Sequence, residues 1–443
     1  MAEDAISGSN DELATKAGNY FVSNYPPFSF WKPEFVPSFQ DALARVPDPA
    51  NPLGLYVHIP FCRQRCHFCY FKVYTGVKAK EIRTYVDAAL HEMSLYASHP
   101  WVGGRKPKFV YFGGGTPSFL STSQLEVLTS GLQKFIPWDE AEEITFECEP
   151  GTLTEDKLRF VRDLGVTRLS LGVENFDAHI LEVNGRAHRT EEIHRAYAFA
   201  RSIQFPQINI DLIAGMMDES EENWVDCVQK AIELDPDSIT VYQMEIPYNT
   251  TIFRQMKEAG RITAPVADWE TKRRWVQYAF EQFEENGYRV GSAYTAVKAD
   301  REVSFVYRDE LWRGADLLSL GVASFGHING VHYQNEHDMD AYLALLGKGE
   351  RPVYRAMVTE PQERLVREFI LQFKLGYVDR GYFDRKFGVD VTGAFAEPLD
   401  RLREWGFLKS ENGRIQLTRD GLLQIDRLLH EFFLPQHQNA RYA

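Results

Sequence analysis

The sequence predicts an α/β fold in which a parallel sheet is covered by helices, followed by a smaller helical domain. Between residues 53 and 242, short apolar runs alternate with amphipathic helical stretches, which is the pattern of parallel strands joined by crossover helices. From about Met357 the pattern becomes mainly helical. The chain of 443 residues can bury a sizeable core, and 44% of its residues are hydrophobic. One large domain and one smaller domain are therefore expected.

Six strands and five connecting helices are expected in the first part of the chain. Each expected strand is an apolar run, and each expected helix carries an apolar stripe at helical spacing. The strands are expected at residues 53–58, 109–112, 144–147, 168–173, 208–212 and 238–242. The helices are expected at residues 80–97, 121–135, 154–164, 190–203 and 221–234. These patterns leave a barrel and an open sheet as alternatives.

The C-terminal part is expected to resemble a winged-helix domain. Its helices are expected at residues 362–373, 381–387, 392–405 and 419–433, with short strands at 408–409 and 415–418. Acidic and basic residues are mixed there without a basic stripe, so a lid or scaffold is favoured over a DNA-binding surface. The expected organisation is an arm at 1–50, an α/β domain at 51–300, a connecting segment that completes the active site at 301–356 and a helical domain at 357–443.

Charge and cysteine usage exclude several classes of protein. The net charge is −14, from 49 basic and 63 acidic residues, which argues against a general nucleic-acid binder. No apolar run reaches the roughly 18–20 residues needed to span a bilayer, and Met1 to Asn10 lacks the pattern of a signal peptide. Five cysteines, three of them clustered, do not form a disulfide framework. A reducing cytoplasm is the expected location.

The strongest chemical signal is a group of three cysteines after the first expected strand. Cys62, Cys66 and Cys69 have the spacing C-x3-C-x2-C. Thiolates this close together suit a soft metal centre such as an iron–sulfur cluster, zinc or copper(I). A four-iron cluster normally takes four cysteines, so three leave one iron open to a chelating substrate. Zinc is the main alternative, with His58 or His67 as a possible fourth ligand, because structural zinc sites are closed by four ligands.

This motif, with an aromatic residue at Phe68, resembles that of the radical S-adenosylmethionine (SAM) superfamily. The flanking sequence, from about Asn24 to about Leu434, resembles the oxygen-independent coproporphyrinogen III oxidase (HemN)-like family. The resemblance implies a partial (β/α)6 barrel with its active site at the C-terminal ends of the strands. It also implies a [4Fe-4S] cluster held by the three cysteines, SAM bound at the open iron, an electron donor such as flavodoxin or ferredoxin, a small-molecule substrate and a monomeric protein.

Two further motifs at expected strand ends match the family. A turn of three glycines ends at Gly115 and is followed by Thr116, and its bare backbone can approach a ligand closely. Glu147 closes the third expected strand, where a carboxylate is costly unless it is paired or faces a ligand. By themselves these features also fit a plain turn and a surface acid. The resemblance implies that Gly114, Gly115, Thr116 and Glu147 contact SAM.

The resemblance implies a further set of SAM contacts, because some family members bind two SAM molecules. Glu174 stands where the family usually has glutamine, and Arg186 and Asp211 follow at the ends of successive strands. Guanidinium suits a carboxylate, and aspartate suits an ammonium or a ribose hydroxyl. Positions tied to the second SAM are Phe68, Gly115, Thr116, Glu174, Arg186, Asp211 and, as a looser match, Met244. Tyr56 and Phe325 match ring contacts around the first SAM and the cluster.

Two departures from the family pattern decide the expected reaction. Phe71 stands where coproporphyrinogen oxidases have a further cysteine, and Glu174 replaces the usual glutamine. Radical methyl transfer or cyclopropanation of an unsaturated small molecule, using two SAM molecules, is therefore ranked first. Decarboxylation of coproporphyrinogen III is ranked second. Heme delivery is ranked third, because the histidine that marks the heme chaperones is missing before Trp312. No catalytic acid or base is assigned.

Overall fold

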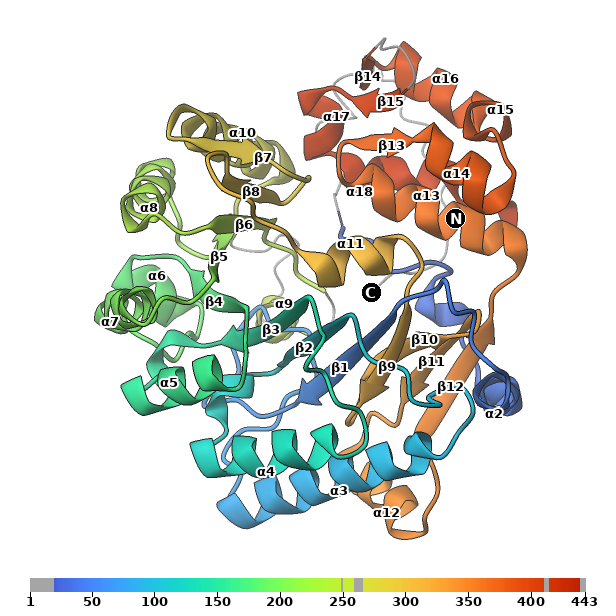
Figure 1. Ribbon diagram of the computed structural model, residues 1–443. Coiled ribbons are helices and arrows are strands. Elements are labelled where there is room, and N and C mark those ends of the chain that lie inside the picture. Colours follow the sequence, from blue (N-terminus) through green and yellow to red (C-terminus); the bar gives the residue numbers. More distant parts are fainter. Residues whose placement is uncertain (1–19, 248–249, 259–265, 410–413, 439–443) are drawn as a thin grey trace.

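The protein is described by a computed structural model that covers residues 20–247, 250–258, 266–409 and 414–438. Its centre is a large sheet in which six parallel strands are adjacent in the order of the sequence (Figure 1). These strands are β1 (Leu53–Ile59), β2 (Phe109–Gly114), β3 (Glu143–Cys148), β4 (Arg168–Glu174), β5 (Gln207–Ala214) and β6 (Ser238–Gln243). All six predicted strands are confirmed, within two residues at each end.

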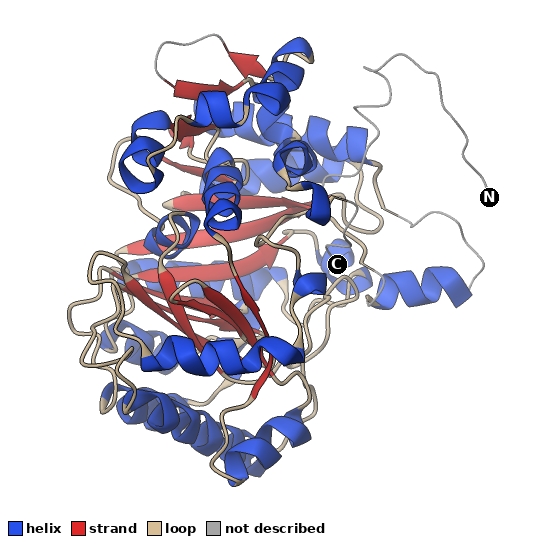
Figure 2. Ribbon diagram, turned by 90° about the vertical axis from the view of Figure 1, so that its right-hand side faces the viewer, coloured by secondary structure: helices blue, strands red, loops and turns tan. Residues whose placement is uncertain are grey.

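Helices connect these parallel strands and cover the sheet. Figure 2 shows them as a layer along the sheet, consistent with strands that are almost entirely buried. They are α3 (Ala79–Ala97), α4 (Thr122–Gln133), α5 (Glu155–Asp163), α6 (Ala178–Val183), α7 (Thr190–Ser202) and α8 (Glu221–Leu234). Ser121, Thr154 and Ser220 cap three of them by accepting a backbone N–H in the first turn. The five predicted helices are confirmed, and the short α6 is additional.

The sheet continues beyond the six predicted strands. β7 (Tyr288–Val290) and β8 (Thr295–Lys298) extend it past β6, and β9 (Asp316–Leu320) pairs in parallel with β1. An antiparallel meander of β10 (Phe325–Ile328), β11 (Val331–Asn335) and β12 (Val353–Val358) follows β9. Helices outside the six-strand repeat are α2 (Val36–Ala44), α9 (Thr251–Glu258), α10 (Trp269–Glu285), α11 (Val306–Trp312) and α12 (Met339–Gly347).

The C-terminal part is helical, as predicted. It contains α13 (Pro361–Phe373), α14 (Arg380–Phe387), α15 (Val391–Ala394), α16 (Ala396–Glu404), α17 (Arg419–Leu423) and α18 (Ile425–Leu429). A small sheet has the strand order β13 (Tyr377–Asp379), β15 (Arg414–Leu417), β14 (Leu408–Lys409).

Two predicted C-terminal helices are each divided. The helix predicted at 392–405 breaks at Phe395, because Pro398 lacks an N–H and is tolerated only in the first turn of a new helix. The helix predicted at 419–433 breaks at Gln424 and ends as a 3-10 turn.

An N-terminal arm packs its rings between the sheet and the C-terminal helices. Phe28 lies 4.6 Å from Phe325 of β10, and Tyr25 lies 5.0 Å from Phe433, between ring centroids. Val22 and Tyr25 belong to the buried core of the C-terminal part, which is separate from the main core beneath the central sheet. Residues 1–19 of the predicted arm at 1–50 lie outside the described residues. The predicted domain boundaries stay a prediction.

A fully buried ion pair joins the arm to the C-terminal helices. Lys374 lies 2.8 Å from the carboxylate of Asp426, and neither side chain is more than 1% exposed. Burial lowers the pKa of the lysine ammonium. Lys374 also donates to the carbonyl of Val22, whose N–H donates to Asp426, and the hydroxyl of Tyr294 donates to the same carboxylate. Each buried polar group of this junction thus has a partner.

Changing Asp426→Ala is expected to lower the free energy of unfolding by about 3–5 kcal/mol, because the Lys374 ammonium would stay buried without its counter-charge. Equilibrium urea denaturation measures the change. Asp400→Ala is the matched control, since Asp400 pairs with Arg403 on an exposed surface, and its cost should stay within about 0.5 kcal/mol. Equal losses in the two variants would contradict a structural role for the junction.

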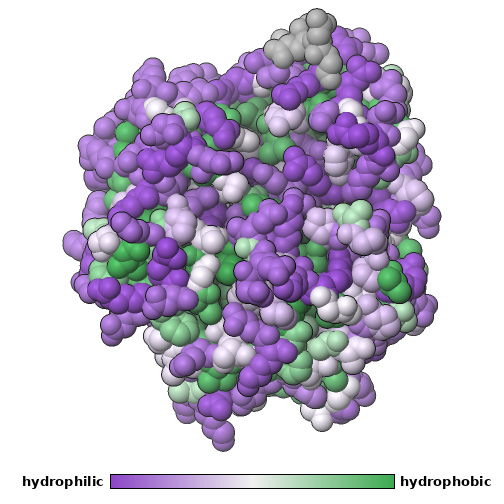
Figure 3. Space-filling view, viewed as in Figure 1, coloured by the Kyte–Doolittle hydropathy of each residue, from purple (hydrophilic) through white to green (hydrophobic). Residues whose placement is uncertain are grey.

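The outer surface is mainly hydrophilic on the face shown in Figure 3, with apolar residues in small separate areas. None of the helices within the described part of the chain is long and apolar enough to cross a bilayer.

Candidate active site

The cysteine loop follows β1 at the C-terminal edge of the parallel strands. Backbone hydrogen bonds hold its start, because Cys62 N–H donates to the Tyr74 carbonyl and Tyr74 N–H donates to the Pro60 carbonyl, at 3.1 and 2.8 Å. Cys69 N–H donates to the Cys66 carbonyl at 3.2 Å. All three thiols are free of disulfides, with Cys62 buried and Cys66 and Cys69 partly exposed. The loop therefore presents three thiols from one short, closed turn.

The glycine turn after β2 lies directly against this loop. Gly115 N–H donates to the Ile59 carbonyl and Thr116 N–H to the Phe61 carbonyl, at 2.8 and 2.9 Å. The Thr116 hydroxyl donates to Cys62 Sγ at 3.3 Å. A Cβ atom on Gly115 would lie 2.9 Å from the Ile59 carbonyl oxygen and 3.0 Å from that sulfur, so only a glycine lets the turn pack this closely against the cysteine loop.

A carboxylate anchors the cysteine loop to the end of β3, and sequence reasoning missed it. Arg63 forms a two-point ion pair with Glu149, at 3.0 and 2.9 Å, and also donates to the Ala187 carbonyl at 2.8 Å. Burial alone would raise the pKa of Glu149, but hydrogen bonds from His188 and Arg63 outweigh it and lower the pKa to about 2. The carboxylate therefore stays ionised at neutral pH and fixes the loop. The only signal in the sequence was an acid directly before a proline, which is not specific.

Three carboxyl groups lie on β3, β4 and β5: Glu147 near the end of β3, Glu174 at the end of β4 and Asp211 in the middle of β5. Glu174 is buried, whereas Glu147 and Asp211 are partly buried. Glu147 accepts hydrogen bonds from the Tyr111 hydroxyl and from Gly114 N–H, at 2.5 and 3.1 Å. Asp211 accepts from Ser170 and Asn209, at 3.1 and 3.0 Å. Burial raises the pKa of each, to about 7 for Glu147.

Glu174, the third carboxyl group, is held in an unusual backbone conformation. Its φ is +65°, in the left-handed region, and the pairing of β4 with β5 shifts register beside it. Such a conformation is costly for a residue with a side chain and is common at ligand sites. Burial, with the charges of Asp211 and Glu147 adding to it, raises the pKa of Glu174 to about 7. The three carboxyl groups thus influence one another across one space.

Arg186 connects this carboxylate group with the cysteine loop. Its guanidinium donates to Cys66 Sγ at 3.3 Å and to the Gly172 carbonyl at 2.6 Å, and it lies 3.4 Å from the Glu174 carboxylate. The Arg186 Nε is buried without a hydrogen-bond partner among the described residues. A buried guanidinium with a free N–H suits an added carboxylate ligand.

Four further predicted SAM contacts are aromatic or apolar side chains. Tyr56 stacks on Tyr111, with ring centroids 5.9 Å apart. Phe325 is 37% exposed and packs against the arm. Phe68 and Met244 lie together in a small apolar cluster.

Part of the segment 301–356, predicted to complete the active site, packs against β2 and β3. The Tyr307 ring, from α11, lies 4.1 Å from that of Tyr111, and the backbone N–H groups of Val306 and Tyr307 donate to the buried Glu143 carboxylate at 2.9 and 3.1 Å. Its role in the active site stays a prediction. Tyr307–Trp312, the place of the heme-chaperone marker, lies in α11, away from the cysteines.

The donor set fits an iron–sulfur cluster better than a single metal ion. Among the residues that the structure describes, no three His, Cys, Asp or Glu side chains are grouped as ligands of one ion. A closed zinc site needs four ligands around one ion, whereas a four-iron cluster spreads its thiolates over separate iron atoms.

Comparison with known proteins places this site in a family. Residues 56–231 match the Radical SAM superfamily model. An oxygen-independent coproporphyrinogen III oxidase from Helicobacter pylori is 27% identical over 398 residues, which cover 86% of each chain. The solved structure of the Escherichia coli enzyme HemN, described as a radical SAM enzyme, matches 93% of this chain and 96% of its own, with a TM-score of 0.81 and 26% identity. This chain contains a Radical SAM domain and is similar to HemN over nearly its whole length.

The HemN-like relatives carry two different names. Heme chaperone HemW from Bacillus subtilis is 27% identical over 370 residues, covering 83% of this chain and 96% of HemW. The predicted fold class and family are confirmed. The first-ranked reaction is not supported, because these HemN-like relatives are named as coproporphyrinogen oxidases or as a heme chaperone and not as methyltransferases or cyclopropanases.

Proposed function

We propose that this chain is a radical SAM enzyme that oxidatively decarboxylates propionate side chains of coproporphyrinogen III. One observation carries the proposal: three thiols, a glycine turn and three carboxyl groups lie on or directly after adjacent parallel strands in a fold that matches HemN along nearly its whole length. The H. pylori relative, matched over 86% of both chains, supports the same substrate. This ranking reverses the one that the sequence favoured.

The two departures from the family pattern are compatible with this proposal. The Phe71 ring is 47% exposed and lies against Tyr70, with ring centroids 4.5 Å apart, so it does not fill the space between the thiols. Glu174 lies beside Arg186, and its raised pKa of about 7 leaves little net charge to repel an anionic substrate. Neither residue therefore argues against a porphyrinogen.

The chain's own residues hold and orient the cofactors in this proposal. Cys62, Cys66 and Cys69 would hold a [4Fe-4S] cluster, and the backbone groups of Gly114 and Gly115, which lie against the cysteine loop, would contact SAM. When bound, cluster and SAM together would supply a 5′-deoxyadenosyl radical that removes a hydrogen atom from the substrate. The partly buried carboxylates of Glu147 and Asp211 suit the positive charge of an ammonium or sulfonium, which would favour their ionised forms.

The number of SAM molecules is part of the proposal. Arg186, Asp211 and Glu174 are proposed to hold a second SAM, with Phe68, Gly115, Thr116 and Met244 around it, whereas Tyr56 and Phe325 serve the first. The free Nε of Arg186 and the strained backbone of Glu174 support a ligand at this place.

Heme delivery is the second candidate. It is favoured by the match to HemW over 96% of that chain and by Phe71, which replaces the additional cysteine of the oxidases. A chaperone binds heme without consuming SAM, so the two candidates differ in a measurable way.

The test is anaerobic incubation of the reconstituted protein with SAM, dithionite and coproporphyrinogen III. We expect protoporphyrinogen IX and 5′-deoxyadenosine to form together. Tight heme binding without either product would support the chaperone, and S-adenosylhomocysteine in step with 5′-deoxyadenosine would support methyl transfer. An acidic electron donor such as flavodoxin or ferredoxin, a monomeric state, and a reducing compartment such as the cytoplasm complete the proposal.

A further inference from the structure

A cavity of about 430 Å³ lies at the opposite edge of the sheet from the cysteines. Arg168, Gln207 and Ser238, which line it, are the first residues of β4, β5 and β6, whereas the cysteine loop follows the last residue of β1. The cavity lies where these strand starts meet the β7–β8 hairpin, the segment before α11 and the small C-terminal sheet. Its size falls in the range of small-molecule sites, which is about 300–1,000 Å³.

The cavity is strongly cationic in a protein whose net charge is −14. Its charged lining consists of six bases and two acids: Arg168, Arg289, Arg308, Arg313, Lys409, Arg419, Glu284 and Asp309. Both acids are already paired, because Glu284 binds Arg419 at 2.7 Å and Asp309 binds Arg308 at 2.7 Å. The other four basic residues of the lining are therefore not paired with an acidic residue of the cavity. They are Arg168, Arg289, Arg313 and Lys409.

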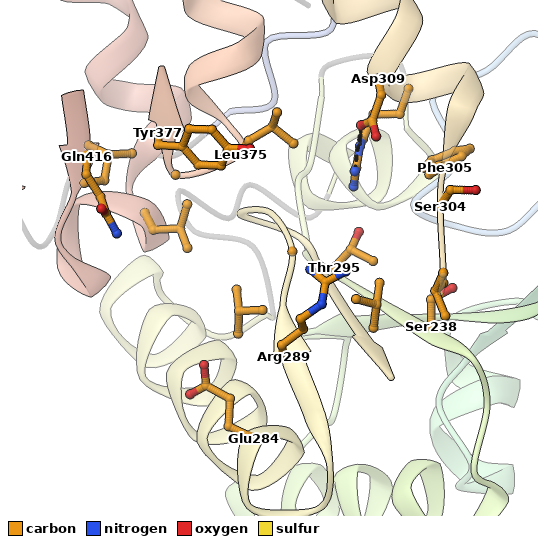
Figure 4. A pocket seen from close by; sticks show the side chains of 18 of the residues that line it. Ser238, Glu284, Arg289, Thr295, Ser304, Phe305, Asp309, Leu375, Tyr377 and Gln416 are labelled. Carbon is orange, nitrogen blue, oxygen red and sulfur yellow. Dashed lines mark hydrogen bonds and ion pairs between the residues drawn. The ribbon is translucent and has the colours of Figure 1, made fainter. Parts of the chain in front are cut away.

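Three of these four cations come from three separate elements. Arg289 belongs to β7, Arg313 follows α11, and Lys409 ends β14; among the described residues, none of the three has a side-chain ion pair or hydrogen bond. Figure 4 shows Arg289 reaching into the middle of the cavity, with Asp309 and Phe305 on one side and Tyr377 on the other. Exposed like charges that converge from separate elements repel one another, unless an anion lies between them.

Arg168 adds a buried cation to the wall. It is 3% exposed, its guanidinium lies 4.0 Å over the Phe305 ring, and its Nε has no hydrogen-bond partner among the described residues. A buried polar group without a partner is uncommon and indicates a missing ligand. Val290, Leu375 and Leu417 supply apolar wall between the cations.

We propose that this cavity binds a small organic polyanion, with two or more carboxylate or phosphate groups on an apolar body. Arg289, Arg313 and Lys409 hold the anionic groups, and the apolar wall and Phe305 contact the body. Arginine suits both kinds of anion because its planar fork matches carboxylate and phosphate oxygens. The proposal does not depend on the reaction at the cysteines, since α11 and the Tyr307 ring separate the two places.

Isothermal titration calorimetry of the reconstituted full chain tests the site with benzene-1,3,5-tricarboxylate and with inorganic pyrophosphate, under anaerobic conditions. The variant is Arg289→Glu with Arg313→Glu. The control is Lys134→Glu with Lys348→Glu, which makes the same change in net charge at exposed lysines on the ends of α4 and α12, outside the cavity. Circular dichroism melting checks that each variant folds.

At least one probe is expected to bind the unaltered chain, and its affinity should fall at least about tenfold in the cavity variant, because two charge-assisted contacts are lost. The control should change by less than about twofold at 0.15 M salt, where distant charges are screened. Preference for the tricarboxylate assigns a polycarboxylate, and preference for pyrophosphate assigns a phosphorylated ligand. The proposal is overturned if neither probe binds, or if both double variants lose affinity equally.

SAM cleavage to 5′-deoxyadenosine is measured in the same preparations. It should be unchanged in the cavity variant, since none of its residues lies among the thiols or the buried carboxyl groups. If coproporphyrinogen III were not converted, the result for anion binding in the cavity would still stand. If no anion bound, the result for coproporphyrinogen III conversion would still stand.

Discussion

Changing Cys66→Ala should abolish cleavage of SAM, with 5′-deoxyadenosine formation falling at least about 1,000-fold under anaerobic reducing conditions. Three thiols are the minimum that hold a four-iron cluster with one open iron, and Arg186 donates directly to Cys66 Sγ. Loss of this thiol would remove one cluster ligand and one of the acceptors of the Arg186 guanidinium. Iron and sulfide content, read together with the product assay, measures the effect.

Cys148→Ala and Cys227→Ala are the matched controls. Both thiols are buried at no more than 5% exposure, and Cys148 lies in β3 and Cys227 in α8, outside the cysteine loop. Burial raises the pKa of the Cys148 thiol, which keeps it protonated and inert. These variants should retain cluster content and product formation. If Cys66→Ala kept a full complement of iron and sulfide, the assignment of the three cysteines would be wrong.

Changing Asp211→Asn should separate SAM cleavage from substrate conversion. Asp211 accepts hydrogen bonds from Ser170 and Asn209 and lies among the carboxyl groups near Arg186 rather than in the cysteine loop. Loss of one preorganised charge at a reacting site costs about 100-fold or more. We therefore expect conversion of coproporphyrinogen III to fall about 100-fold, while 5′-deoxyadenosine formation continues uncoupled.

Glu92→Gln is the control for neutralising a buried carboxyl group. Glu92 is fully buried on α3, where Tyr342, Gly321 and Asn335 donate to it, and burial raises its pKa to about 7. It lies outside the group formed by Glu147, Glu174 and Asp211, so its variant should keep both activities. Normal coupling of SAM cleavage to product in Asp211→Asn would exclude the proposed role of Asp211.

The part of the fold that local sequence encodes was predictable. Apolar runs and caps such as Ser121 gave β1–β6 and their helices, because each depends on a few neighbouring residues. The pairing of β9 with β1 joins segments more than 250 residues apart, and no local periodicity reports it. For the same reason β7 and β8 were not predicted in the α/β domain at 51–300, and β9 to β11 were not predicted in the connecting segment at 301–356.

The candidate site also has one part that the sequence shows directly and another part that depends on the fold. The cysteine spacing and the glycine turn are continuous motifs, so the sequence shows them directly. The Arg63–Glu149 ion pair, the left-handed backbone of Glu174 and the packing of the Tyr307 ring depend on three-dimensional contacts. Charge in particular was misjudged, because Glu174 was considered without its partner Arg186. A side chain's effect on substrate choice depends on its neighbours as much as on its own type.

The most direct test of the proposed decarboxylation follows the hydrogen atom that is removed from the substrate. Coproporphyrinogen III deuterated on the ring-bound carbon of each propionate is incubated anaerobically with the reconstituted protein, SAM and reductant. Conversion of a propionate to a vinyl group removes one hydrogen atom from that carbon, releases CO2 and passes one electron to a one-electron acceptor. We expect 5′-deoxyadenosine that is heavier by one mass unit, formed together with protoporphyrinogen IX. Unlabelled 5′-deoxyadenosine with no vinyl product would contradict the proposed decarboxylation.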